Sequence, residues 1–317
     1  MAIQGQDPRG ARLAVRARSR GTSAADVDRA LTEDRSLLIT WLNRGTLHLV
    51  ASEDYRWLHA LTTPPLMASG ARRLAQEGVT PSAAERGMGV IERSLAREGP
   101  LTRGALGERL VAAGVPTAGQ ALIHLLILAS IRGLLVRGPM LGSEHAYVLV
   151  DDWLGAGSAA PFERDVALAE LARRYLAGHG PAEDRDLARW AGLPLRDARA
   201  GLGAIASELE VREDGLVDLV RRAPPSELPP PRLLGAFDPL LLGWRSRAEL
   251  LGANRTLVTV NGIFRPFALV AGRAVATWRI VAREVVLEPF GRIAATVGQA
   301  LGEDAEDVLR YLGVAPR

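Results

Sequence analysis

The pattern of apolar positions in the middle of the chain predicts one structural unit that occurs twice. In the first copy, three segments have the spacing of helices, at residues 84–99, 100–114 and 117–133. Thr102 is expected to cap the second helix and Gly114 to end it. Residues 134–150 then follow the pattern of strand, turn and strand. Three helices followed by a hairpin is the order of a winged-helix domain.

The second copy repeats this order over a shorter stretch. Its predicted helices cover residues 162–180, 181–193 and 194–211. A small hairpin follows at 210–220, with its turn at Asp214-Gly215. We therefore place winged-helix domains at residues 84–158 and 159–222.

The first eighty residues resemble an incomplete third member of the series. A helix is expected to begin after Thr22 or Ser23, and a hairpin covers 39–50 with its turn near Asn43-Arg44-Gly45. A second helix is expected over 52–61, with Ser52 as its cap. Residues 1–83 would thus form an N-terminally truncated winged-helix domain. A complete copy would need about 10–14 more residues in a leading helix.

The pattern changes after a proline-rich linker at residues 221–232. Residues 256–290 are rich in strand-forming residues, with turns expected at Asn261-Gly262 and Ala271-Gly272. A closing helix is expected at 305–313. The predicted fold is α+β and mainly α, with tandem winged-helix domains and a C-terminal β-rich domain over 232–317.

Composition excludes several kinds of chemistry. The chain has 39 basic residues besides histidine and all are arginine, so no lysine side chain is available to form an imine. It has no cysteine, which excludes thiolate nucleophiles and cysteine-based metal sites. The five histidines are scattered without a metal-ligand spacing, so we expect no metal and no cofactor. No long apolar run or signal-like segment is present, and the expected location is cytoplasmic.

Four phrases together resemble the AlkZ family of winged-helix DNA glycosylases, which includes the YcaQ-like branch. They are "QGQDPRGARLAVRAR", "TWLNRGTLHLV", "LLGAFDPLLLGWRSRAELL" and "NGIFRPFALVAGRAVATWR". The resemblance extends from Ile3 to about residue 285. Each phrase is weakly specific alone, and the combination is what identifies the family.

The resemblance implies that Gln4 and Gln6 are the catalytic residues. The family motif is glutamine, an apolar residue and glutamine in the AlkZ branch, with aspartate in the last place in the YcaQ-like branch. Gln4 and Gln6 match the AlkZ branch. The sequence departs from the family at Gly5, where a larger apolar side chain is usual, and in the helix that normally precedes the motif. Without the resemblance, Gln-Gly-Gln near a terminus would be interpreted as a polar turn.

The resemblance also implies the reaction. The family excises purines alkylated at N7, including those in interstrand cross-links. Such a base is already cationic and departs neutral, so no general acid is required, in contrast to ordinary glycoside hydrolysis. Two amides can position the attacking water by hydrogen bonding. Because no lysine is present, we expect a monofunctional enzyme that leaves an abasic site. The expected partner is double-stranded DNA with alkylated purines, bound by a nucleoid-associated monomer without membrane contact.

Candidate DNA contacts come from arginines. Arg9, Arg12 and Arg16 are spaced to share one helix face, which suits phosphate binding, although a merely solvated face is an equally good interpretation of each. The resemblance implies that the hairpin with Arg44 and His48 approaches the lesion and that His48 contacts the DNA backbone. The remaining phosphate candidates are Arg245 and Arg247.

Two alternatives remain open at this point. Tandem winged helices are commonest in transcription factors, so the chain could be a non-enzymatic DNA-binding regulator or a catalytically degenerate homologue.

The large aromatic residues of the chain are expected in the core rather than as stacking platforms; they are Trp41, Tyr55, Trp57 and Trp244.

Overall fold

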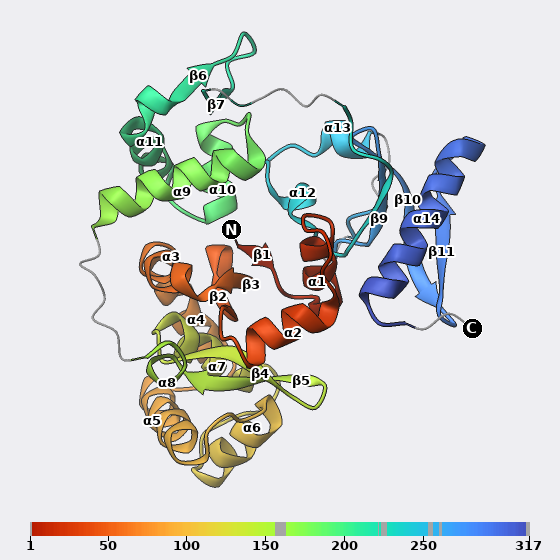
Figure 1. The fold of residues 1–317 in the computed structure, drawn as a ribbon. Helices are drawn as coiled ribbons and strands as arrows, with labels where there is room; N and C mark the ends of the chain where they lie inside the picture. Colours follow the sequence, from red (N-terminus) through yellow and green to blue (C-terminus); the bar gives the residue numbers. More distant parts are fainter. Residues whose placement is uncertain are drawn as a thin grey trace.

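A computed structural model describes residues 2–155, 163–220, 222, 227–252, 256–259 and 262–314. Helices and strands are mixed and helices predominate, which confirms the predicted α+β class. The elements surround the N-terminal strand β1, Ile3–Gln4, which lies near the centre of the molecule (Figure 1). Within the described residues, no helix is both long and apolar enough to cross a lipid bilayer.

The N-terminal region contains two helices, a hairpin and two further helices after β1. They are α1 Pro8–Arg16, α2 Ala24–Thr32, β2 Leu37–Leu42, β3 Thr46–Ala51, α3 Tyr55–Thr62 and α4 Met67–Gln76. Ser23 caps α2 by a reciprocal pair of hydrogen bonds with Asp26, so the predicted start is confirmed. Ser52 does not cap α3, because its hydroxyl donates to the carbonyl of Arg35 and a 3₁₀ turn precedes the helix. The sequence pattern did not single out α4.

The next region follows the predicted helix–helix–helix–hairpin order. Its elements are α5 Pro81–Glu98, α6 Arg103–Ala112, α7 Ala121–Ile131, β4 Leu135–Leu141, β5 Glu144–Leu149 and the short α8 Val150–Leu154. The Thr102 hydroxyl accepts from the amide of Ala105 and caps α6 as predicted. Gly114, with φ of +66°, follows the end of α6.

The third region repeats that order with shorter elements. They are α9 Arg164–His179, α10 Asp184–Ala191, α11 Leu195–Ala204, β6 Leu209–Val211 and β7 Val217–Leu219. Gly215, with φ of +82°, lies in the predicted turn between the two strands. The predicted boundary at residues 158 and 159 lies outside the described residues. The domain limits at 1–83, 84–158, 159–222 and 232–317 therefore stay predictions.

The C-terminal region is built around a four-stranded sheet. Its elements are β8 Arg232–Leu234, α12 Pro239–Leu242, α13 Ala248–Leu251, β9 Phe267–Val270, β10 Arg273–Val281, β11 Glu284–Pro289 and α14 Ala295–Tyr311. The turn at Ala271-Gly272 is confirmed, whereas Asn261 lies outside the described residues, as does much of the linker at 221–232. The closing helix begins ten residues earlier than predicted.

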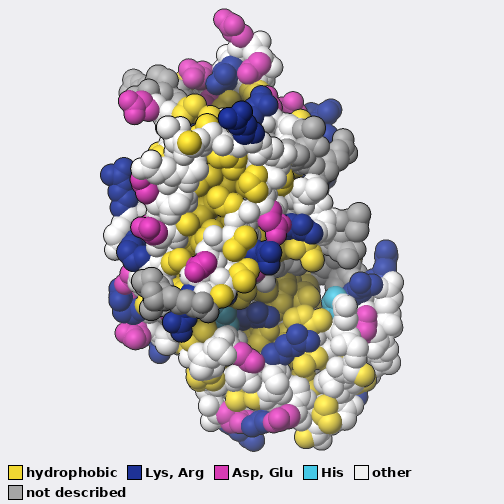
Figure 2. Space-filling model, turned by 90° about the vertical axis from the view of Figure 1, so that its right-hand side faces the viewer, with side chains coloured by type: hydrophobic (Ala, Val, Ile, Leu, Met, Phe, Trp, Pro, Cys, Tyr) yellow, Lys and Arg dark blue, Asp and Glu magenta, His cyan; other side chains and the backbone are white. Residues whose placement is uncertain are grey.

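Sheet pairing links regions that the sequence pattern separates. The larger sheet has the order β1-β3-β2-β4-β5, so hairpins from the first two predicted domains share it. The C-terminal sheet has the order β11-β10-β9-β8, with α14 against it. On this side of the molecule, hydrophobic side chains form a band with charges of both signs around it (Figure 2). The N-terminal strand β1 is the edge strand of the larger sheet and pairs with β3.

Candidate functional site

The predicted catalytic glutamines lie where the edge strand β1 turns into helix α1. Gln4 pairs with His48 of β3, and the amide of Gly5 donates to the carbonyl of Leu47 at 2.7 Å. Asp7 then caps α1, and Pro8 occupies its first turn. Backbone pairing on one side and the helix cap on the other therefore hold Gln4 and Gln6 in place.

Gly5 occupies a position that would accept a small side chain. A Cβ atom there would lie 3.4 Å from the amide nitrogen of Leu49 and 3.7 Å from a methyl group of Ile39, which are ordinary contacts. Because the amide of Gly5 is bonded within the sheet, the motif keeps a defined backbone despite the glycine.

The side chains of the two glutamines form a hydrogen bond with each other. The Gln4 Nε2 atom donates to Oε1 of Gln6. Gln4 is 7% exposed, and its own Oε1 atom is buried without a hydrogen-bond partner among the described residues. Gln6 is exposed, and its amide donors face no described partner. The pair thus offers a free acceptor and free donors to a polar group such as water.

Both glutamines line a cavity of about 310 Å³. Its other lining residues come from the β2–β3 turn, the end of α10 and the C-terminal region; they are Arg44, Thr46, Arg189, Phe237, Leu242, Arg247, Gly262 and Phe264. None of these residues is acidic. The cavity thus combines two neutral amides, three guanidinium groups and an apolar wall.

Arg44 is fixed against the end of helix α10. Its Nη1 atom donates to the carbonyl of Arg189 at 3.2 Å and to that of Trp190. Gly192 ends α10 with φ of +70°, and a Cβ atom there would approach the amide nitrogen of Arg44 to 2.6 Å. Glycine is therefore required for the β2–β3 turn to approach α10 this closely.

The apolar wall is positioned by another close approach. A Cβ atom on Gly10 of α1 would lie 2.3 Å from the carbonyl oxygen of Ala236, which precedes Phe237. This contact brings Phe237, at φ of +55°, beside the glutamines. Its ring centroid lies 5.5 Å from that of Phe264, and the guanidinium of Arg247 lies 5.1 Å from the centroid of Phe264.

The three guanidinium groups act on one another. Burial, with repulsion from Arg189 and Arg247, lowers the pKa of Arg44, and burial with repulsion from Arg189 lowers the pKa of Arg247. Among the described residues, none of the three forms an ion pair with a carboxylate. The cavity is therefore electropositive.

His48, expected to contact the DNA backbone, pairs with Gln4 across β1 and β3, and its imidazole is buried and neutral. It is 3% exposed, and one ring nitrogen, Nδ1, bonds the carbonyl of Thr46 at 2.9 Å. Burial, reinforced by Arg44, lowers the pKa of His48 to about 3. The imidazole is thus a backbone-bonded core group, and it is not among the residues that line the cavity.

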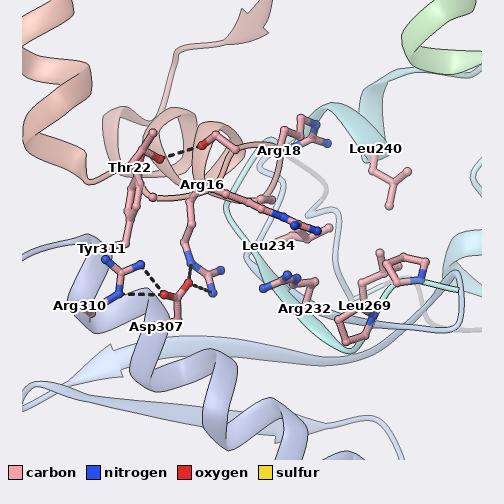
Figure 3. A pocket seen from close by; sticks show the side chains of 16 residues that line it. Arg16, Arg18, Thr22, Arg232, Leu234, Leu240, Leu269, Asp307, Arg310 and Tyr311 are labelled. Carbon is pink, nitrogen blue, oxygen red and sulfur yellow. Dashed lines mark hydrogen bonds and ion pairs between the residues drawn. The ribbon is translucent and has the colours of Figure 1, made fainter. Parts of the chain in front are cut away.

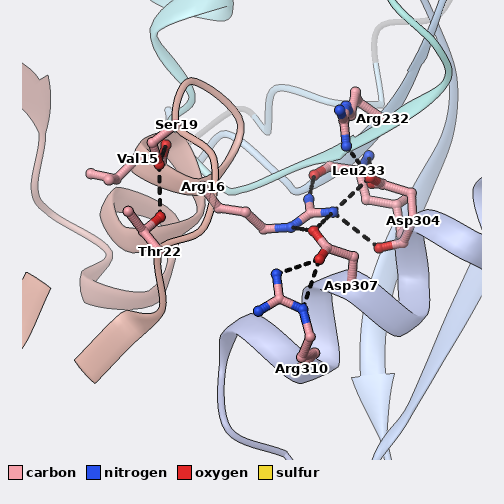
Figure 4. Close-up of polar contacts among 9 residues, drawn as sticks. All are labelled: Val15, Arg16, Ser19, Thr22, Arg232, Leu233, Asp304, Asp307 and Arg310. Carbon is pink, nitrogen blue, oxygen red and sulfur yellow. Dashed lines mark hydrogen bonds and ion pairs between the residues drawn. The ribbon is translucent and has the colours of Figure 1, made fainter. Parts of the chain in front are cut away.

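The arginines of α1 have other roles, which corrects the expectation of a shared phosphate-binding face. Arg12 is buried and donates to the carboxylate of Asp28 and to the carbonyl of Pro8. The Arg16 side chain is 3% exposed and bonds Asp304, at 2.6 Å, and Asp307, at 2.8 Å (Figure 4). Arg9 alone of the three is exposed. Arg9 therefore stays a phosphate candidate, whereas Arg12 and Arg16 are paired with carboxylates inside the protein.

A larger cavity, of about 1060 Å³, adjoins the C-terminal end of α1 (Figure 3). Its arginines include Arg18, which makes a two-pronged ion pair with the fully buried Asp238, and Arg232, which bonds Asp304 at 2.8 Å. Arg310 is paired with Asp307. These pairs join the segment after α1 to the start of α12, join β8 to α14 and lie within α14, so the charges here serve the fold.

The two arginines that the sequence predicted as phosphate contacts in the segment after α12 differ in position. Arg247 lines the glutamine cavity. Arg245 does not, and its side chain lies 3.9 Å from the carboxylate of Glu183. Its backbone amide donates to Asp186 at 2.8 Å and fixes this segment to α10. Arg245 stays a phosphate candidate on its exposure alone.

Sequence reasoning did not single out six of the residues that line the cavity: Thr46, Arg189, Phe237, Leu242, Gly262 and Phe264. Arg189 looked like one polar position on an amphipathic helix, and nothing local distinguishes it from Arg185. The two phenylalanines fall within phrases quoted for the resemblance. The aromatic residues expected in the core are there: Trp41 and Tyr55 are buried, and Trp57 and Trp244 are partly buried against it.

Comparison with known proteins identifies the family. A sequence model of the AlkZ-like DNA glycosylases matches residues 1–311. An interstrand DNA cross-link repair glycosylase from Streptomyces sahachiroi is 30% identical over 96% of this chain and 86% of its own length. The solved structure of Streptomyces sahachiroi DNA glycosylase AlkZ has a TM-score of 0.78, with 28% identity over 99% of this chain and 89% of that chain. These matches decide against a non-enzymatic regulator: the chain belongs to the AlkZ-like DNA glycosylases, enzymes that hydrolyse N-glycosyl bonds.

Proposed function

We propose that this glycosylase removes N7-alkylated, cationic purines from double-stranded DNA, including purines joined in interstrand cross-links, and leaves an abasic site. The observation that carries the proposal is the composition of the cavity: two bonded glutamines with no acidic side chain among the lining residues. Such a cavity has no carboxylic acid to protonate a departing base. It therefore suits a base that is already charged and departs neutral.

The glutamines supply the position of the water. The buried Oε1 atom of Gln4 can accept a hydrogen bond from water, while the Gln6 amide can donate a hydrogen bond to the same water or to the sugar. As the bond between the cationic base and the sugar breaks, a water held in this way forms a new C–O bond at the anomeric carbon and then loses one proton to bulk water. Neither amide changes protonation, so the pair contributes by orientation and by its dipoles.

Two further facts support the proposal. The relative from Streptomyces sahachiroi is described as an interstrand cross-link repair glycosylase, which supports cross-linked purines as substrates. The chain has no lysine, so no side-chain amine can form an imine with the sugar and cleave the strand. The proposed enzyme is thus monofunctional.

The test is release of N7-methylguanine from duplex DNA by the wild-type protein and by Gln4→Ala and Gln6→Ala. Loss of one oriented amide is expected to lower the single-turnover rate constant by about 10²–10³-fold. Gln299→Ala, in an exposed part of α14, is a matched control and should act like wild type. Equal release by wild type and both variants would exclude a catalytic role for the pair, and strand cleavage at the abasic site would exclude the monofunctional assignment.

A further inference from the structure

Three guanidinium groups converge on the glutamine cavity from regions far apart in the sequence. Arg44 comes from the β2–β3 turn, Arg189 from α10 and Arg247 from the segment after α12. Three like charges around one cavity repel one another, and no acidic side chain among the lining residues offsets them. Such an arrangement costs free energy in the unbound protein and is expected where an anion binds.

The contacts that hold these side chains leave hydrogen-bond donors free. Arg44 uses Nη1 on carbonyls of α10, and Arg247 uses Nε on the carbonyl of Leu241 while its face packs on Phe264. Each guanidinium has five N–H groups, so both keep donors for a ligand. Arg189 is exposed and has no side-chain hydrogen bond among the described residues. The guanidinium groups of Arg44 and Arg247 are thus fixed in place, and the exposed side chain of Arg189 can reorient to bind a ligand.

The anion that a DNA glycosylase meets here is a phosphodiester of its substrate. The cavity volume lies at the low end of the range for small-ligand sites, so it accommodates part of one nucleotide. We propose that Arg44, Arg189 and Arg247 bind one phosphate beside the lesion nucleotide, and that this phosphate must be bound before the glycosidic bond breaks. The inference rests on the proposed function and extends it to the chemistry of substrate recognition.

The physical reason concerns the charge that the reaction moves. As the cationic base departs, its positive charge passes to the sugar, next to the glutamines. Three uncompensated guanidinium groups would oppose that charge in a partly desolvated site. A bound phosphate cancels part of their field and adds its own attraction. Occupancy of the arginine site therefore raises the rate constant and not only the affinity, and a free nucleoside without a phosphate is not a substrate.

The test replaces one phosphate at a time by an uncharged methylphosphonate around a single N7-methylguanine in a duplex. For wild type, one linkage is expected at which neutralisation lowers the single-turnover rate constant by about ten- to a hundredfold. Arg189→Gln on the unmodified duplex should lose a similar factor. Because both changes remove the contact between Arg189 and that phosphate, the loss for the two together should be smaller than the product of the two single losses. Arg189→Lys should recover part of the rate.

The control for loss of a single positive charge is Arg196→Gln, whose side chain is 86% exposed on α11. It should act like wild type at each linkage. The proposal is overturned if Arg189→Gln keeps the wild-type rate constant, or if its loss multiplies with the methylphosphonate loss at each linkage tested.

A binding measurement separates this inference from the proposed reaction. The same linkage series is prepared around a tetrahydrofuran abasic site, and affinity is measured by fluorescence anisotropy. One neutral linkage should weaken binding to wild type and have a smaller further effect on Arg189→Gln, in which only Arg44 and Arg247 still attract that phosphate. If wild type fails to release N7-methylguanine, the proposed function fails while this measurement still judges the phosphate site. Additive losses at each linkage would refute the site itself.

Discussion

Arg16 and Arg18, at and just after the C-terminal end of helix α1, differ from the arginines of the glutamine cavity in the charges that surround them. Arg16 is buried between Asp304 and Asp307, and Arg18 is paired with the buried Asp238. Arg44, Arg189 and Arg247 line a cavity that has no acidic residue among its described lining residues. A guanidinium enclosed by carboxylates stabilises the fold, whereas a cluster of them without carboxylates is available to a ligand. The surrounding charges, and not the residue type, assign the role.

The largest effect is expected on the structural side of the comparison. Arg16→Ala would leave the buried carboxylate of Asp304 with Arg232 as its remaining arginine partner and would leave a cavity at the Arg16 site. Removing one member of a buried pair costs up to about 3–5 kcal/mol, so the free energy of unfolding should fall by up to that amount in urea denaturation. Arg189→Ala, at an exposed position, should change it by less than about 0.5 kcal/mol. Equal losses for the two variants would erase the distinction between the two sets.

A carboxylate introduced into the cavity should make its arginines resemble Arg16 and Arg18, which are paired with carboxylates. In Arg189→Glu, the new side chain can pair with Arg44 and Arg247 and compete with a phosphate. We expect base release to fall by about a hundredfold or more, since both attraction and available donors are lost. Stability should stay the same or rise. A variant that keeps its rate constant in single-turnover assays would contradict a phosphate role for the cavity arginines.

A backbone change should disturb the cavity without removing a charge. Gly192→Ala places a methyl group against the backbone of Arg44 at a residue with positive φ. We expect a loss of about 1–3 kcal/mol in unfolding free energy, together with slower base release as Arg44 moves away from Arg189. Gly178→Ala in α9 is the matched control, because nothing lies within 4 Å of its Cβ position. It should stabilise the protein by about 0.5–1 kcal/mol.

The smallest effect is expected from pH. The folded pKa of His48, about 3, lies below its ordinary value of 6.5, so this group destabilises the fold only as the pH falls below 6.5. Glutamine does not titrate, and the arginines stay charged. The rate constant for base release should therefore change by less than about threefold between pH 6.5 and 8. A titration within this range would point to an ionising group that the glutamine mechanism does not contain.

Local structure could be predicted from the sequence because its causes are local. Each of three confirmed features depends only on neighbouring residues in the sequence: the helix caps at Ser23 and Thr102 and the turn at Gly215. Ser52 was misplaced because a 3₁₀ turn competes with the helix start. The shared five-stranded sheet was not foreseen, since it pairs strands from two predicted domains.

The site could be predicted only in part. Gln4 and Gln6 came from a family resemblance, because neutral amides carry no chemical signal of their own. The partners of Arg16 lie almost 300 residues away in the sequence, so helical spacing alone could not reveal its burial. Arg189 became visible only when the fold placed it with Arg44 and Arg247. Whether an arginine is paired is a property of tertiary structure.

The most direct test is to locate the reacting sugar. The measurement is a structure of the protein with duplex DNA in which a pyrrolidine replaces the sugar of the lesion nucleotide and carries positive charge where the reaction develops it. We predict the pyrrolidine in the cavity, within hydrogen-bond reach of the Gln4 and Gln6 amides directly or through one water, with a neighbouring phosphate on Arg189. A pyrrolidine bound outside this cavity, away from both glutamines, would contradict the assignment of the site.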